Sequence, residues 1–225
     1  IGFPVGRRVP DAQLPYLLGV GWYRREFVAP GEGRVSLSVG GAVLDTWAWL
    51  NGTFIGHHVG RETAFEMSLD GTLRHGETNE LIIAVTNTRT DRLGCAIRGY
   101  KGKSGGIYGP VSLSVSGHAR VVDFHVYPSD DMMTLNWSAS IDDPAEKAEM
   151  TLAWSVRDPE TKAIIGKGSV PAKAAALRWT TDTLGMEPWS DRSPKLYQVS
   201  VELREGEERL DALTQRFGLR RLIAD

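Results

Sequence analysis

The sequence predicts an all-β protein made of two consecutive β-sandwiches. Apolar and polar residues alternate with a period of two along most of the chain, as in VSLSV at 35–39 and again at 111–115. This period is typical of antiparallel strands that bury one face. Helical periodicity is nearly absent. Turn-forming residues are frequent, with 25 glycines and 11 prolines among 225 residues, which suits many short strands joined by turns.

The first half of the chain contains a clear hairpin signal in TWAWLNGTFIGHH, residues 46–58. Asn51-Gly52 lies between two apolar runs, and both central residues of a type I′ turn need a positive φ, which Asn and Gly tolerate. Alternation places Trp47 and Trp49 on one face of the strand before the turn. We interpret them as residues of the core or of a cleft wall. LIIAV at 81–85 is apolar on both faces and predicts a central strand.

The second half has a regular rhythm of about seven strands in about 100 residues, which is the number expected of an immunoglobulin-like sandwich. Trp137 and Trp154 are its expected core anchors, and Met133 is expected to share the buried face of Trp137. The predicted strands are VVDFHVY at 121–127, MTLNWSASI at 133–141, MTLAWSV at 150–156, AIIGKGSV at 163–170, ALRWT at 176–180, LYQVSVEL at 196–203 and LTQRFGL at 213–219.

A boundary between the two halves is expected near Ser116-Gly117-His118. Long irregular loops separate the strands before this point, and short ones separate the strands after it. The sequence therefore predicts domains at about 1–117 and 118–220. One of the long loops, 89–106, has no periodicity, and loops of that length in a compact domain are usually functional or disordered.

Composition argues against several classes of function. The net charge is −2, with 26 basic and 28 acidic residues, so there is no electrostatic case for binding nucleic acid or an anionic membrane. No apolar run approaches the roughly 20 residues of a spanning helix. The single cysteine, Cys95, excludes an intrachain disulfide and a four-cysteine zinc site. Secreted and cytoplasmic locations both stay open.

Two motifs suggest a metal or phosphate site, but neither carries one. His57 and His58 are adjacent on a predicted strand, so their side chains point to opposite faces and cannot share an ion; one imidazole is expected to be half-buried and the other exposed. KGKSGG at 101–106 is similar to the end of a phosphate-binding loop, but that motif requires glycine where this chain has Ile97. We expect no metal and no cofactor.

Six segments, taken in order, resemble the non-catalytic front of the family 2 glycoside hydrolases, which include β-galactosidases, β-glucuronidases and β-mannosidases. Each segment alone is a weak signal, and their order along nearly the whole chain is specific. They are WYRREF at 22–27, WAWLNGTFIGHHVG at 47–60 with AFEMSLDGTL at 64–73, NELIIAVTNTR at 79–89, SGGIYGPVSL at 104–113, PWSDRSPKLYQVSVEL at 188–203 and RFGLRRL at 216–222.

The resemblance implies a galactose-binding-like jelly-roll sandwich over 1–117, followed by the immunoglobulin-like β-sandwich over 118–220. In the family, the catalytic glutamates lie in a barrel domain that follows the FGLR segment. Residues 221–225 would therefore begin the linker to that barrel, and we expect no catalytic residues in this chain. Carbohydrate and the barrel domain are the implied partners.

The resemblance also suggests substrate-binding residues in the long loop. In several family members this loop reaches the active site and carries an acidic residue six positions before the second glycine of the Gly-Gly-Ile-Tyr segment. Here that position is Tyr100, so the sugar contact of the family is altered. The loop candidates are Arg89, Asp91, Arg98 and Tyr100, with a plain surface role as the alternative for each. Alternative functions for the chain are a free-standing carbohydrate-binding module or a structural tandem of β-sandwiches.

Overall fold

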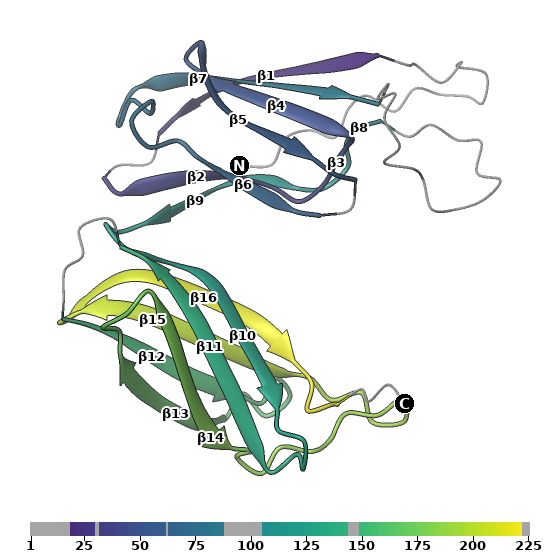
Figure 1. Ribbon diagram of the computed structural model, residues 1–225, viewed down its shortest axis with the longest axis vertical. Helices are drawn as coiled ribbons and strands as arrows, with labels where there is room; N and C mark the ends of the chain where they lie inside the picture. Colours follow the sequence, from purple (N-terminus) through teal and green to yellow (C-terminus); the bar gives the residue numbers. More distant parts are fainter. Residues whose placement is uncertain (1–18, 30–31, 62, 88–104, 144–148, 222–225) are drawn as a thin grey trace. The chain divides into compact units, whose positions relative to one another are not determined.

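The computed structural model describes residues 19–29, 32–61, 63–87, 105–143 and 149–221 (Figure 1). Within these ranges the chain forms 16 strands and no helix, so the all-β prediction is confirmed. The described part consequently contains no helix long and apolar enough to cross a membrane. The chain divides into two compact units, Ile1–Val115 and Ser116–Asp225, and each is described by itself.

The first unit is a sandwich of two main sheets, seen as two layers in Figure 1. The strand order is β1-β7-β4-β5 in one sheet and β6-β2-β9 in the other, and β3 and β8 form a separate pair. The bounds are β1 Val20–Val28, β2 Arg34–Val39, β3 Ala42–Val43, β4 Asp45–Leu50, β5 Thr53–Val59, β6 Phe65–Ser68, β7 Thr78–Thr86, β8 Gly106–Ile107 and β9 Val111–Ser116.

Strand alternation produces the core of this unit. Val35, Leu37 and Val39 of β2 are buried as predicted, and β7, which contains LIIAV, lies between β1 and β4 as predicted for a central strand. The second VSLSV segment is less buried, because only Val111 reaches the core fully and Val115 is exposed.

The predicted hairpin is present, with Asn51 at φ 50° and Gly52 at φ 82° between β4 and β5. Asn51 also ties the turn to the sheet: its amide nitrogen donates to Asn79 Oδ1 at 2.8 Å, and its Oδ1 accepts from the Glu80 backbone N–H at 3.0 Å. Asn79 is fully buried and donates in turn to the Arg74 carbonyl at 2.8 Å. A buried amide chain therefore fixes the turn.

The core interpretation of the two tryptophans of β4 is wrong. Thr46, Ala48 and Leu50 face the core and are buried, whereas Trp47 and Trp49 lie on the outer face and are partly exposed. Alternation shows which residues share a face but not which face is covered. Thr46 and Ala48 face the opposing sheet instead, and their small side chains are fully buried there.

The second unit contains the seven predicted strands, in sheets ordered β10-β11-β14 and β13-β12-β15-β16 (Figure 1). Its core is formed by inward-facing residues of both sheets, with Tyr197, Val199, Val201 and Leu203 of β15 buried as predicted. The bounds are β10 Arg120–Pro128, β11 Thr134–Asp142, β12 Met150–Arg157, β13 Ile164–Pro171, β14 Ala176–Asp182, β15 Tyr197–Glu205 and β16 Glu208–Phe217.

Trp137 is the centre of this core, only 1% exposed. Its ring centroid lies 5.2 Å from that of Trp154, 5.6 Å from that of Trp179 and 6.0 Å from that of Phe124. The prediction of Trp137 as an anchor is confirmed, and Trp154 packs against it while partly exposed. The prediction for Met133 is wrong, because this residue precedes β11 and is 66% exposed.

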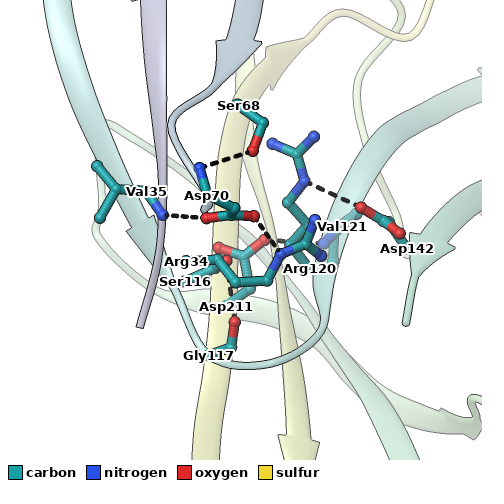
Figure 2. Close-up of polar contacts among 10 residues, drawn as sticks. All are labelled: Arg34, Val35, Ser68, Asp70, Ser116, Gly117, Arg120, Val121, Asp142 and Asp211. Carbon is teal, nitrogen blue, oxygen red and sulfur yellow. Dashed lines mark hydrogen bonds and ion pairs between the residues drawn. The ribbon is translucent and has the colours of Figure 1, made fainter. Parts of the chain in front are cut away.

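Carboxylates bind backbone and arginine groups in each unit separately (Figure 2). In the first unit, Asp70 accepts from Arg34 Nε at 3.0 Å and from the Val35 backbone N–H at 3.2 Å. In the second unit, Asp211 accepts from the Val121 backbone N–H at 2.8 Å. The Asp70 bonds connect the loop after β6 to the start of β2, and the Asp211 bond connects β16 to the start of β10.

Candidate functional site

The four loop residues predicted to bind substrate, Arg89, Asp91, Arg98 and Tyr100, lie outside the described residues. The structure does describe the two positions between which their segment runs, Asn87 after β7 and Gly105 before β8. The geometry of these two ends shows how the fold presents the segment.

Both ends of segment 88–104 meet at one place. The Asn87 side chain accepts from the Gly19 N–H at 3.1 Å, and the Asn87 N–H donates to the Gly19 carbonyl at 3.4 Å. A Cβ added to Gly105 would lie only 2.6 Å from Asn87 Nδ2. Asn87 and Gly105, the described residues that flank the segment, therefore lie side by side next to the start of β1.

Tyr23 of β1 holds the returning end. Its hydroxyl oxygen accepts from the Ile107 N–H at 3.3 Å. Gly106 has φ 88°, and a Cβ there would lie 2.5 Å from the same hydroxyl. Both the backbone conformation and the close approach require glycine at this position, which gives a physical reason for the second glycine of the SGGIYG segment.

Tyr108, which directly follows β8, holds this part of the chain against the residues before β3. Its hydroxyl donates to the Arg61 carbonyl, and its ring lies against Gly41, where a Cβ would be 2.4 Å from Tyr108 Cζ. Gly41 directly precedes β3, the strand that pairs with β8. The end of the segment is thus fixed by aromatic contacts and strand pairing.

A cluster of aromatic side chains lies on the outer face of the β1-β7-β4-β5 sheet. The rings of Trp22 and Trp49 stack with centroids 5.8 Å apart and an interplanar angle of 27°. Phe54 meets Trp49 edge-on at 5.9 Å. Trp22 is 66% and Phe54 54% exposed. We call Trp22, Trp49 and Phe54 the aromatic strip.

Polar groups border the aromatic strip. On one side, Arg24 bonds the carboxylates of Glu26, at 2.8 Å, and Glu80. The Glu80 hydrogen bond, its charge and that of Glu26 raise the pKa of Arg24. On the other side, His57 Nε2 lies 3.1 Å from Asp45 Oδ1 and its ring stacks on Trp47 at 4.9 Å. Both borders offer donors and acceptors to a ligand.

Sequence reasoning did not select Trp22 as a site residue. The available signal was its position in WYRREF: Tyr23 and Phe27 pack in the core, so the residues alternating with them must face outward. An apolar ring on that outward face is the feature that could have revealed the strip.

Comparison with known proteins matches both units. Residues 119–220 match the model of glycosyl hydrolases family 2, and residues 9–91 match that of the β-galactosidase second all-beta domain. β-Galactosidase BgaC of Bifidobacterium adolescentis is 25% identical over 244 residues, which cover 96% of this chain and 23% of the relative. A β-galactosidase of Lactobacillus delbrueckii subsp. bulgaricus is 27% identical over 83% of this chain and 18% of its own.

Residues 119–220 thus carry a family 2 glycosyl hydrolase domain, and the chain is similar to β-galactosidases along most of its length. A solved structure of a family 2 member from Bacteroides cellulosilyticus superposes with a TM-score of 0.77 and 19% identity, over 95% of this chain and 31% of the other. At that identity the likeness shows the fold alone, and it supports the predicted jelly-roll and immunoglobulin-like sandwiches. The chain spans less than a quarter of the length of the two curated relatives.

His57 and His58 lie on opposite faces of β5. His57 is exposed and contacts Trp47, whereas His58 is half-buried and stacks on Phe65 at 4.1 Å. This matches the predicted division. Burial of the imidazole lowers the pKa of His58, and electrostatic repulsion from His57 lowers it further. Within the described ranges no group of three or more His, Cys, Asp or Glu side chains is placed to hold a metal ion.

A shallow hollow of about 340 Å³ lies in the second unit over β10, β11 and β14. Its polar lining comes from the outward residues Asn136, Ser138, Arg178 and Thr180, with Tyr127 at one side. These groups can hydrogen-bond a ligand, but none of those side chains is a carboxylate, so the hollow lacks the acid and base that glycoside hydrolysis requires.

Proposed function

We propose that this chain is a non-catalytic portion of an O-glycosyl hydrolase. In this proposal the jelly-roll domain, 1–117, shapes the substrate pocket, and the immunoglobulin-like domain, 118–220, braces the catalytic barrel, with 221–225 beginning the linker between them. The observation that carries the proposal is the order of the two matched domains, 9–91 and then 119–220.

The residues that flank segment 88–104 are well defined. Asn87 and Gly105 lie side by side, so the segment runs between two neighbouring positions of the sandwich. Arginine, aspartate and tyrosine side chains supply the donors and acceptors that sugar hydroxyls need, which supports Arg89, Asp91, Arg98 and Tyr100 as substrate contacts.

The absence of catalysis in this chain is proposed on chemical grounds. Glycoside hydrolysis needs two carboxyl groups facing each other across a sugar-sized gap, one of them protonated. Glu26 and Glu80 are register partners on β1 and β7, but both bond Arg24 on an open sheet face. The same guanidinium binds both carboxylates, so they do not face each other across an empty sugar-sized gap.

The substrate proposed for the whole enzyme is a β-galactoside, following the names of the two curated relatives. The test is hydrolysis of nitrophenyl β-galactoside and nitrophenyl β-glucuronide by the purified chain, with a complete family 2 β-galactosidase as the positive control. We expect no release of nitrophenol above background. Turnover by the pure chain that disappears when one carboxylate is replaced would contradict the proposal.

A second candidate is carbohydrate binding without a catalytic partner. The exposed aromatic strip favours it, since stacked rings on a rigid sheet can hold a glycan in the absence of any barrel.

A further inference from the structure

The aromatic strip occupies the middle of an open sheet face in the first unit. Strand register places Trp22 of β1 opposite Ala84 of β7, and Ala84 opposite Trp47 of β4. The next row contains Arg24, Ile82 and Trp49, and Phe54 of β5 pairs with Trp49. Ala84 is small and buried, so the rings of the two flanking strands can close over it.

The rings of the strip are held in place before any ligand arrives. Trp22 and Trp49 stack on each other and Phe54 supports Trp49 edge-on. All three belong to regular strands or to a tight hairpin. Tryptophan has only two side-chain torsions, and mutual stacking restricts both. Little side-chain entropy would therefore be lost when a ligand binds.

The width of the strip favours a sugar over a protein as its occupant. Specific protein interfaces bury about 800 Å² per partner around a centre depleted of charge. Here the apolar band is only two residue rows deep. The Arg24 network borders it directly on one side, and Asp45 with His57 borders it on the other.

A pyranose matches this layout. One face of the ring carries axial C–H bonds that pack against an aromatic ring, and hydroxyls surround its rim. Aromatic rings present a negative face that attracts such C–H groups. Carboxylate, guanidinium and imidazole groups next to the ring can exchange hydrogen bonds with the hydroxyls.

We propose that the outer face of the β1-β7-β4-β5 sheet is a glycan-binding surface, on which Trp22 stacks against a pyranose of a β-linked oligosaccharide. Arg24 and Glu80 bind hydroxyls of that sugar, and Phe54 contacts the next residue of the glycan. The proposal rests on the proposed function, because it takes carbohydrate as the ligand class.

The test is titration of the full chain with a β-linked galactotetraose, followed by isothermal calorimetry and by tryptophan fluorescence. We expect saturable binding of roughly millimolar strength, because an open face covers only one side of the sugar. Trp22→Ala should weaken binding about threefold to tenfold, as for loss of one aromatic stacking contact. Phe54→Ala should weaken binding of the tetraose more than binding of galactose.

Met133→Ala is the matched control, because Met133 is 66% exposed, like Trp22, but belongs to the second unit and lies outside the lining of its hollow. It should leave binding unchanged. All three variants should keep the thermal midpoint within about 2 °C of the parent chain, since each removes an exposed side chain. A variant that fails to fold is replaced by Trp22→Gln, which keeps a side chain but removes the ring.

Three results would overturn the proposal: no saturable binding of the tetraose, binding unaffected by Trp22→Ala, or binding lost equally in Met133→Ala. Self-association of the chain that Trp22→Ala abolishes would identify the strip as a protein contact and would also overturn it. These outcomes leave the proposed function standing, because that proposal fails only on hydrolysis by the isolated chain.

Discussion

Replacement of Trp137 by alanine should be the most destabilising single change in the second unit. Trp137 is 1% exposed, contacts three aromatic rings and donates from Nε1 to Thr181 Oγ1 at 3.0 Å. Trp137 lies on β11, which pairs with β10 on one side and with β14 on the other. Both ladders hold the backbone, so it cannot move into the space that the missing ring leaves. The cavity should therefore persist.

The expected loss in the free energy of unfolding follows from burial. A buried tryptophan removes about 150–250 Å² from water, and at about 25 cal/mol per Å² that corresponds to about 4–6 kcal/mol. Measured Trp→Ala changes cost about 3–5 kcal/mol, so we expect about 4–5 kcal/mol for Trp137→Ala. Trp154→Ala should cost less, about 2–3 kcal/mol, because Trp154 is partly exposed.

Native-state hydrogen exchange of the β11 and β15 amides measures this loss in the second unit alone. A loss of about 4 kcal/mol corresponds to exchange about a thousandfold faster. Thr181→Val serves as a milder variant, with an expected cost of about 1–2 kcal/mol, because it removes the hydroxyl that accepts from Trp137 Nε1 and donates to the Asp182 carbonyl. An acceleration of less than about tenfold in Trp137→Ala would refute the burial on which this reasoning depends.

Two further predictions concern the first unit. Asn51→Ala should lower the free energy of unfolding by about 2–3 kcal/mol, because it leaves the Glu80 N–H without its acceptor, removes the donor to Asn79 Oδ1 and the Thr72 carbonyl, and places alanine at a positive φ; urea unfolding checks this, and a cost below about 0.5 kcal/mol would contradict it. Burial alone would raise the pKa of Asp70, but hydrogen bonds from Arg34, Val35 and Ser68 and the charge of Arg34 together lower it. A folded pKa below the unfolded one means that Asp70 contributes stability above about pH 4 and loses it as the pH falls through the folded pKa. Because the side chain is 38% exposed, the contribution should be less than about 1 kcal/mol. Acid unfolding of Asp70→Asn should lack this part of the pH dependence, and an unchanged acid profile would argue against it.

Local signals made much of the fold predictable. The Asn51-Gly52 turn was predicted because its backbone conformation depends on two residues only, and the strands of the second unit because period-two alternation is a property of the strand itself. The number of strands then followed by counting, and the family resemblance supplied the order of the two sandwiches.

The sequence predicts less well which face of a strand is buried and at which residue a strand begins. Trp47 and Trp49 share a face, but only the position of the opposing sheet decides that this face is outside. Met133 continues the alternation of β11, yet the strand begins one residue later, so its side chain stays in solvent.

The candidate site was the least accessible to sequence reasoning. The aromatic strip depends on β1 and β4 lying on either side of β7, and no pattern within 22–27 shows that Trp22 will meet Trp49. The anchor of segment 88–104 likewise joins Gly19, Asn87 and Gly105, which lie far apart in the chain. The loop candidates Arg89, Asp91, Arg98 and Tyr100 stay predictions.

The central claim is our proposal that this chain binds carbohydrate without cleaving it. Saturation-transfer NMR on the β-linked galactotetraose tests both parts in one sample. We predict that saturation passes from the protein to the ring C–H protons of the sugar, while the anomeric signals keep constant intensity over a day. Growth of new reducing-end anomeric signals would show hydrolysis and contradict the claim, as would a complete lack of saturation transfer.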